Sequence, residues 1–182
     1  GDTIHVAAGE YQEVFPMTVP DGVTLRGANL RSTSVKPTGA TNNNNAFILS
    51  GDSHVSDLTI KEFFYDSGND KGYAFVVVSN MDSTTSPYVE RCTVNTKGSV
   101  TSGSDPYGYT LHSSVLFNEC TFITPNQVGL KITNGMRVEW LNCFNYFASI
   151  GIEGVQGATG RAGAGRVRIK LGGTSGTVNP AE

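Results

Sequence analysis

A six-residue pattern recurs four times in this chain, and it constrains the fold more than any other feature of the sequence. Each copy has a large apolar residue, two mostly polar residues, Leu or Cys, usually Thr, and usually another apolar residue. The copies are Val55–Ile60, Val89–Val94, Phe117–Phe122 and, more loosely, Trp140–Asn145. Their fourth positions are 58, 92, 120 and 143, so successive copies are offset by 34, 28 and 23 residues. Periods of about 20–50 residues are typical of solenoids, in which each repeat stacks on the next.

The pattern also predicts which side chains face the interior, because side chains alternate between the two faces of a strand. In each copy the Leu or Cys and the residue two positions later point inward, and the first apolar residue points inward beyond a bend. The first predicted interior column is Leu58, Cys92, Cys120 and Cys143. The second is Ile60, Val94, Phe122 and Asn145, and the outward column between them is Thr59, Thr93 and Thr121. A buried Asn145 would need hydrogen-bond partners.

The three cysteines are predicted to be core residues. Their number is odd, their spacing is wide and no CxxC pair is present, which argues against a disulfide framework and a zinc site. Cys is among the most readily buried residues and packs as a small hydrophobe. No metal or other cofactor is predicted.

These observations predict an all-β fold, a single-stranded parallel β-helix of about five to six rungs, over residues 1–153. Residues 154–165 form a predicted Gly/Ala-rich linker or turn, in which the regular glycines lack the prolines that favour a collagen helix. Residues 166–182 are a predicted amphipathic strand and tail. This last segment is expected to cap the solenoid, to begin another segment or to pair with a neighbouring chain.

Composition restricts the classes of partner. The formal net charge is −3 and 16% of the residues are charged, which argues against a nucleic-acid binder with a basic stripe. No apolar run approaches the length of a membrane span. The sequence opens on a predicted strand, without an initiator Met or a signal peptide, so we expect a processed product or an excerpt of a longer chain.

Two groups of segments carry a family resemblance. Gly1–Tyr11 and Val19–Gly27 resemble the opening of pectin-lyase-like parallel β-helix proteins, which implies a right-handed solenoid. Phe117–Asn126, Thr133–Phe144 and Arg166–Gly173 resemble structural proteins of tailed bacteriophages, especially of cyanophage type. This second resemblance implies a tail-fibre, tailspike or other virion appendage component that assembles as a homo-oligomer, a trimer, with other virion proteins.

Candidate catalytic residues are Glu90 and Glu119, which adjacent rungs could bring to the spacing of a glycosidase pair. The same register stacks Asp57, Arg91, Glu119 and Asn142 in one column, which instead indicates a ladder of ion pairs. Candidate sugar-binding residues are Tyr107, Tyr109 and Tyr146. The histidines His5, His54 and His112 are dispersed, and no partner is predicted for them.

The predicted function is therefore a structural segment of a phage virion appendage that supports recognition of the host surface or its polysaccharide. A polysaccharide lyase or glycoside hydrolase on the same scaffold is the first alternative. A bacterial extracellular adhesin or matrix fibre is the second alternative, because it uses the same kind of fold.

Overall fold

The protein is an all-β chain of parallel strands. The computed structural model describes residues 1–39, 43–64, 66, 68–69, 71–78, 85–97, 101–104, 114–132, 137–154, 168–172 and 178–179. These residues form twenty strands and no α-helix. Every pair of named strands is parallel. The prediction of an all-β fold with parallel sheets is confirmed.

Four sheets collect strands from the whole described chain. Sheet A has the order β1 (Thr3–Val6), β4 (Thr24–Gly27), β7 (His54–Ser56), β10 (Tyr88–Glu90), β13 (Ser114–Asn118), β16 (Arg137–Leu141) and β19 (Arg168–Gly172). Sheet B has the order β2 (Gly9–Glu13), β5 (Thr33–Pro37), β8 (Thr59–Phe64), β11 (Thr93–Lys97), β14 (Thr121–Ile123) and β17 (Phe144–Tyr146). Sheet C has the order β3 (Met17–Val19), β6 (Phe47–Leu49), β9 (Phe75–Val78) and β12 (Thr101–Ser104). Sheet D has the order β15 (Val128–Ile132), β18 (Ile150–Gly154) and β20 (Val178–Asn179).

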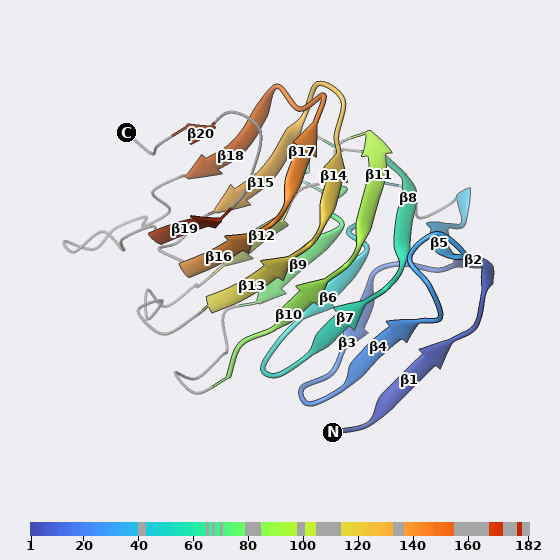
Figure 1. The fold of residues 1–182 in the computed structure, drawn as a ribbon. Helices are drawn as coiled ribbons and strands as arrows, with labels where there is room; N and C mark the ends of the chain where they lie inside the picture. Colours follow the sequence, from blue (N-terminus) through green and yellow to red (C-terminus); the bar gives the residue numbers. More distant parts are fainter. Residues whose placement is uncertain are drawn as a thin grey trace.

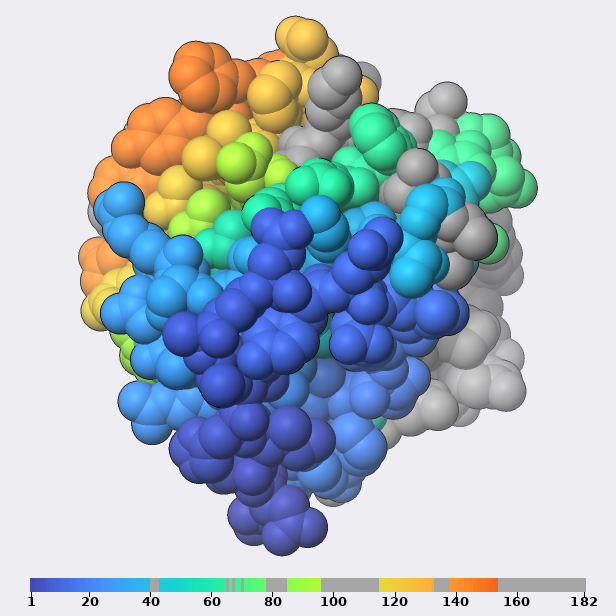
Figure 2. Space-filling view, turned by 90° about the vertical axis from the view of Figure 1, so that its right-hand side faces the viewer, coloured from blue at the N-terminus to red at the C-terminus, as the bar shows by residue number. Residues whose placement is uncertain are grey.

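From β1 to β18 the chain visits the sheets in a fixed rotation, from sheet A to sheet B and then to sheet C or D, before it returns to sheet A (Figure 1). We call the chain from one strand of sheet A to the next a rung. Sheet D follows sheet C along the stack, because β12 and β15 lie side by side. Seen from the N-terminal end, the first strands lie in front of the later ones (Figure 2).

A single residue makes the corner between sheet A and sheet B in four successive rungs. Asp57, Arg91, Glu119 and Asn142 have φ angles of 60°, 48°, 55° and 50°, in the left-handed region. The corner N–H groups bond to the neighbouring rung: Asp57 donates to the Glu90 carbonyl at 3.2 Å and Arg91 to the Asn118 carbonyl at 2.9 Å. This sharp bend is why the apolar residue before the corner and the Leu or Cys after it both face the interior.

The predicted interior columns are confirmed. Leu58, Cys92, Cys120 and Cys143 are all fully buried. Val94 is aligned with Ile60 on one side and with Phe122 on the other, and Phe122 is aligned with Asn145. The first apolar residues of the repeats are also aligned: Val55 with Val89, Val89 with Phe117, and Phe117 with Trp140. Burial of these side chains supplies the main stabilisation of the stack.

Aromatic rings fill the interior along the stack. Phe47 and Phe75 have ring centroids 6.1 Å apart, and Phe75 and Phe117 have centroids 6.2 Å apart. Phe122 and Trp140 are closer, at 4.7 Å. Such contacts add to area burial when rings are offset or tilted, as these are. Asn145, the polar member of its column, donates from Nδ2 to the Gly151 carbonyl at 3.1 Å.

Two short strands near the C-terminal end, at 168–172 and 178–179, join the same sheets. β19 pairs with β16 in parallel, with Leu171 opposite Trp140, and β20 pairs with β18. Both strands therefore extend the stack by one rung. The predicted linker at 154–165 lies outside the described residues, apart from Gly154 at the end of β18.

Candidate functional site

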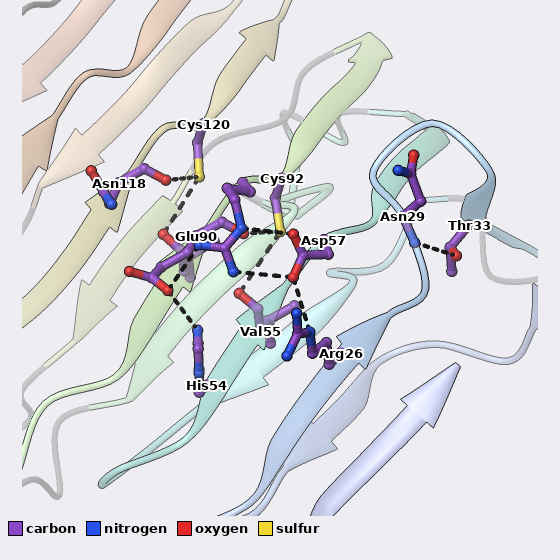
Figure 3. Close-up of polar contacts among 12 residues, drawn as sticks. Arg26, Asn29, Thr33, His54, Val55, Asp57, Glu90, Cys92, Asn118 and Cys120 are labelled. Carbon is purple, nitrogen blue, oxygen red and sulfur yellow. Dashed lines mark hydrogen bonds and ion pairs between the residues drawn. The ribbon is translucent and has the colours of Figure 1, made fainter. Parts of the chain in front are cut away.

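The corner between sheets A and B carries a cluster of charged side chains (Figure 3). Asp57 receives two contacts from the next rung, from Arg91 Nε to Oδ1 at 2.7 Å and from Nη2 to Oδ2 at 3.1 Å. From the preceding rung, Arg26 Nε lies 3.3 Å from Asp57 Oδ2. One carboxylate thus links three rungs through two guanidinium groups.

These contacts fix the ionisation of Asp57. The hydrogen bonds from Arg91 lower the pKa of the Asp57 carboxyl, against a smaller opposing effect of burial. The same pair raises the pKa of Arg91. Asp57 is therefore held as a carboxylate, which suits a structural ion pair and not a general acid, whose pKa must be raised toward the working pH.

Glu90, the first predicted catalytic residue, belongs to the same cluster. Its Oε2 lies 3.3 Å from His54 Nε2 and 3.4 Å from Arg91 Nη1. The expectation that His54 has no partner is therefore wrong. β7 and β10 are adjacent strands, and Glu90 lies opposite Ser56, only two residues along β7 from His54. The His54 ring also meets the Tyr88 ring edge-on, with centroids 6.3 Å apart.

Glu119, the second predicted catalytic residue, lies at the next corner. In the register of β10 and β13 the residue opposite Glu90 is Asn118, so the two glutamates are not directly aligned. Glu119 instead follows Arg91 in the corner column, and its charge contributes to raising the pKa of Arg91. The predicted column of Asp57, Arg91, Glu119 and Asn142 is confirmed. A catalytic role for either glutamate stays a prediction.

A second charged cluster lies on the outer face of sheet B in the first rungs. Glu10 forms ion pairs with Lys36 and with Lys61, one through each carboxylate oxygen. These two contacts lower the pKa of Glu10 to about 2. Glu62 lies 3.9 Å from Lys36 and completes the cluster. The N-terminal part of this face is thus a solvated set of paired charges.

Tyr146, a predicted binding residue, lies on the same sheet at its other end. Its ring is stacked with that of Phe144, with centroids 6.3 Å apart and planes 22° from parallel. The Phe147 ring follows at 6.4 Å from Tyr146. We call Phe144, Tyr146 and Phe147 the aromatic patch; their exposed fractions are 42%, 46% and 76%. The other predicted binding residues, Tyr107 and Tyr109, lie outside the described residues.

Sequence reasoning missed Phe144 and Phe147. Phe144 was detectable, because the repeat places it in the outward column after Thr59, Thr93 and Thr121. Nothing in the sequence indicates that Phe147 is exposed, since the length of the turn after β17 decides it. The described residues contain no group of three His, Cys, Asp or Glu side chains suited to a metal ion.

Comparison of the chain with protein-family models and with curated protein sequences finds no match. Among the described residues, no helix is long and apolar enough to cross a membrane.

Proposed function

We propose that the chain is a right-handed parallel β-helix segment that forms a rigid structural part of a bacteriophage virion appendage, of tail-fibre or tailspike type. The observation that carries this proposal is the in-register stacking of sheets A and B over six rungs or more, around one continuous apolar core. A stack of this kind holds a surface at a fixed distance and orientation, because each inner rung is bonded to both neighbours.

The charged clusters support a structural role. Asp57 and Glu10 each form ion pairs with two basic side chains from other rungs. Such pairs tie rungs together on the outside, as the core does on the inside. The resemblance of three segments to phage structural proteins favours a virion location, assembly with other virion proteins and a homotrimer. In this proposal the segment supports recognition of the host surface.

The test is the oligomeric state and shape of the chain in solution, by light scattering combined with small-angle X-ray scattering. We expect an elongated trimer, because an appendage segment works as part of a fibre or spike. A compact, monodisperse monomer across a wide concentration range would contradict the proposal.

A second candidate function is polysaccharide cleavage, and the cluster of Glu90, His54 and Arg91 is the observation that favours it. The Glu90 carboxylate lies within 3.4 Å of both the His54 imidazole and the Arg91 guanidinium. Lyases and hydrolases use groups of these kinds. The substitutions Glu90→Gln and Glu119→Gln should each abolish polysaccharide cleavage if this function is correct. Cleavage that survives both substitutions rules out this pair of residues.

A further inference from the structure

The aromatic patch carries two separate costs for the fold, the exposure of apolar rings and a left-handed backbone conformation at Phe147. The first cost is exposure. The three rings face outward from β17 and the turn after it, and Phe147 is 76% exposed. Phe117 and Phe122, in the preceding rung, and Trp140, in the same rung, are fully buried. The stability of the stack therefore comes from other aromatic residues.

The second cost is backbone strain at Phe147. Its φ angle is 60°, in the left-handed region that bulky side chains avoid. In the turn after β14, in the preceding rung, the left-handed residue is Asn126, with φ of 61°, and its N–H donates to the Phe147 carbonyl at 3.0 Å. Asn adopts this conformation more readily than Phe does. A bulky residue kept in a strained and exposed position indicates a role outside the fold.

The two turns lie next to each other at the same end of sheets B and D (Figure 1). The hydrogen bond between them holds the turn after β17 against the turn after β14. Phe147 is thus fixed beside Tyr146 by the backbone of two rungs. The patch is a preformed surface, which lowers the entropic cost of binding.

The charge pattern of the outer face of sheet B indicates what the patch binds. One outward column runs from Lys36 and Lys61 through Asn95 and Ile123 to Tyr146. Charge is concentrated at its N-terminal end, where Glu10 pairs both lysines. Neither β14 nor β17 contains a charged residue. The surroundings of the patch on this sheet are therefore suited to an uncharged ligand.

The size of the patch argues against a second copy of the chain as its occupant. Full burial of an aromatic side chain covers about 150–250 Å², so the exposed parts of three rings amount to roughly 300 Å². A stable protein interface buries about 800 Å² on each partner. Along the outward column of this face, Ile123 and Asn95 separate the patch from the paired charges of the first rungs, so the apolar surface extends little beyond the patch.

We propose that the aromatic patch binds the ring faces of uncharged saccharide units. The electron-rich faces of exposed aromatic rings attract the C–H groups of a pyranose ring, and the rings of Phe144 and Tyr146 follow one another along β17 with planes 22° from parallel. Thr121, directly opposite Phe144 on the adjacent strand, and the Tyr146 hydroxyl provide hydrogen-bonding groups at its edge. This inference rests on the proposed function, since it locates the glycan contact of the appendage segment.

The deciding variant is Phe147→Asn, which installs the residue that the preceding rung uses at this backbone conformation. The probe is a panel of immobilised neutral oligosaccharides (glucans, mannans, galactans and chitin oligomers), with oligogalacturonates as anionic comparators. We expect the wild-type chain to bind a neutral member and the variant to lose at least about tenfold in affinity. The thermal midpoint should stay the same or rise, because strain is relieved.

The matched control is Phe64→Asn, which removes an aromatic ring that is also exposed on sheet B, three strands from the patch. This variant should keep glycan binding. Wild-type binding only to anionic glycans, or to none, overturns the inference. Equal loss in both variants, or a Phe147→Asn variant that binds normally, also overturns it.

Light scattering on the same samples separates this inference from the proposed function. An elongated trimer that binds no neutral glycan leaves the appendage proposal standing and removes the saccharide site. A Phe147→Asn variant that changes from trimer to monomer makes the patch a subunit contact, and this result also overturns the saccharide site.

Discussion

At the scale of single residues, the chain repeatedly uses side chains other than glycine in the left-handed backbone conformation. Asp57, Arg91, Glu119 and Asn142 do so at the corner between sheets A and B. No Cβ-branched residue occurs at these corners, and such residues pay the largest penalty there. Where a corner side chain forms contacts between rungs, as Asp57 and Arg91 do, these contacts offset the cost of the backbone conformation.

This backbone conformation predicts different effects for two substitutions at one corner. Glu119→Val should lower the free energy of unfolding by about 1–2 kcal/mol, because it adds β-branching to a left-handed residue. Glu119→Asn also removes the carboxylate but tolerates the conformation, so it should cost less than about 0.5 kcal/mol. Urea denaturation of the two variants measures the difference. Equal destabilisation by both variants would show that loss of the charge, and not the backbone conformation, causes the effect.

Two glycines in equivalent turns give a second matched pair. Gly22 and Gly51 both have positive φ, of 70° and 54°. A Cβ at Gly22 meets nothing within 4 Å, whereas a Cβ at Gly51 would lie 2.1 Å from Asp21 Oδ1. That same oxygen accepts the Asp52 N–H at 2.7 Å. The added methyl group at Gly51 would therefore displace a side chain that links two rungs.

We expect Gly22→Ala to cost about 1 kcal/mol, from the backbone alone. Gly51→Ala should cost about 0.5–1.5 kcal/mol more, because it also breaks the exposed hydrogen bond of Asp21 to the next rung. Thermal or urea unfolding of both variants checks the order. A smaller loss for Gly51→Ala than for Gly22→Ala would contradict the assigned contact.

At the scale of strands and sheets, ion pairs on the outside connect strands whose side chains also meet in the core. The Asp57–Arg91 pair connects the corners of two adjacent rungs, directly outside the buried Leu58 and Cys92. A bidentate guanidinium–carboxylate contact fixes both distance and orientation. The pair therefore reinforces the alignment of β7 with β10 and of β8 with β11.

This pair predicts a pH dependence of stability. The folded chain lowers the pKa of Asp57 below its ordinary value of 3.8, so it binds this proton more weakly than the unfolded chain does. The stabilisation is complete above the unfolded-state pKa and is lost as the pH falls through the lowered pKa of the folded state. Asp57→Asn should cost about 1–3 kcal/mol at neutral pH and should flatten the stability profile below about pH 4.

Arg91→Met provides the control, since it keeps the length of the side chain and removes the charge. It should flatten the same acidic part of the profile, and the double variant should lose little more than either single one. The measurement is urea unfolding at a series of pH values. Profiles that keep the wild-type slope in both variants would contradict the coupling.

At the scale of the whole molecule, stability should vary along the stack. An inner rung is bonded to two neighbours, whereas β1, β2 and β3 are edge strands of sheets A, B and C. Ile4, in the first rung, is 54% exposed, although the aligned Val55 two strands further on is fully buried. Stacked repeats gain most of their stability from contacts with their neighbours.

Hydrogen exchange followed by mass spectrometry should therefore show a gradient. Amides of β7, β8, β10 and β11 should exchange slowest, and amides of β1 and β2 should exchange fastest, because they open without disrupting other rungs. The comparison is made within one sheet, so differences in strand length matter little. Uniform exchange over all rungs of sheets A and B would contradict the gradient.

The part of the fold that follows from side-chain alternation could be predicted from the sequence. The columns of Leu58 and Ile60 were predictable, because buried positions favour apolar side chains in every rung. The contact of His54 with Glu90 was not, because the repeat places Tyr88 opposite His54, and the two side chains meet diagonally, two positions apart in the register. The exposed position of Phe147 was not predictable either, because it follows from the length of the turn after β17.

The corner column has one more consequence, for how the chain finds its alignment. Along Asp57, Arg91 and Glu119 the charge changes sign at each step. If a rung were skipped during folding, Asp57 would meet Glu119, and two carboxylates would face each other without the guanidinium between them. Pairing of a rung with its second neighbour is therefore destabilised by charge repulsion, although the apolar side chains of the core would not by themselves prevent it. We expect Arg91→Glu to refold with more aggregation than Arg91→Met at equal stability. The alternation of charge thus favours the order in which rungs that follow one another in the sequence are also neighbours in the stack.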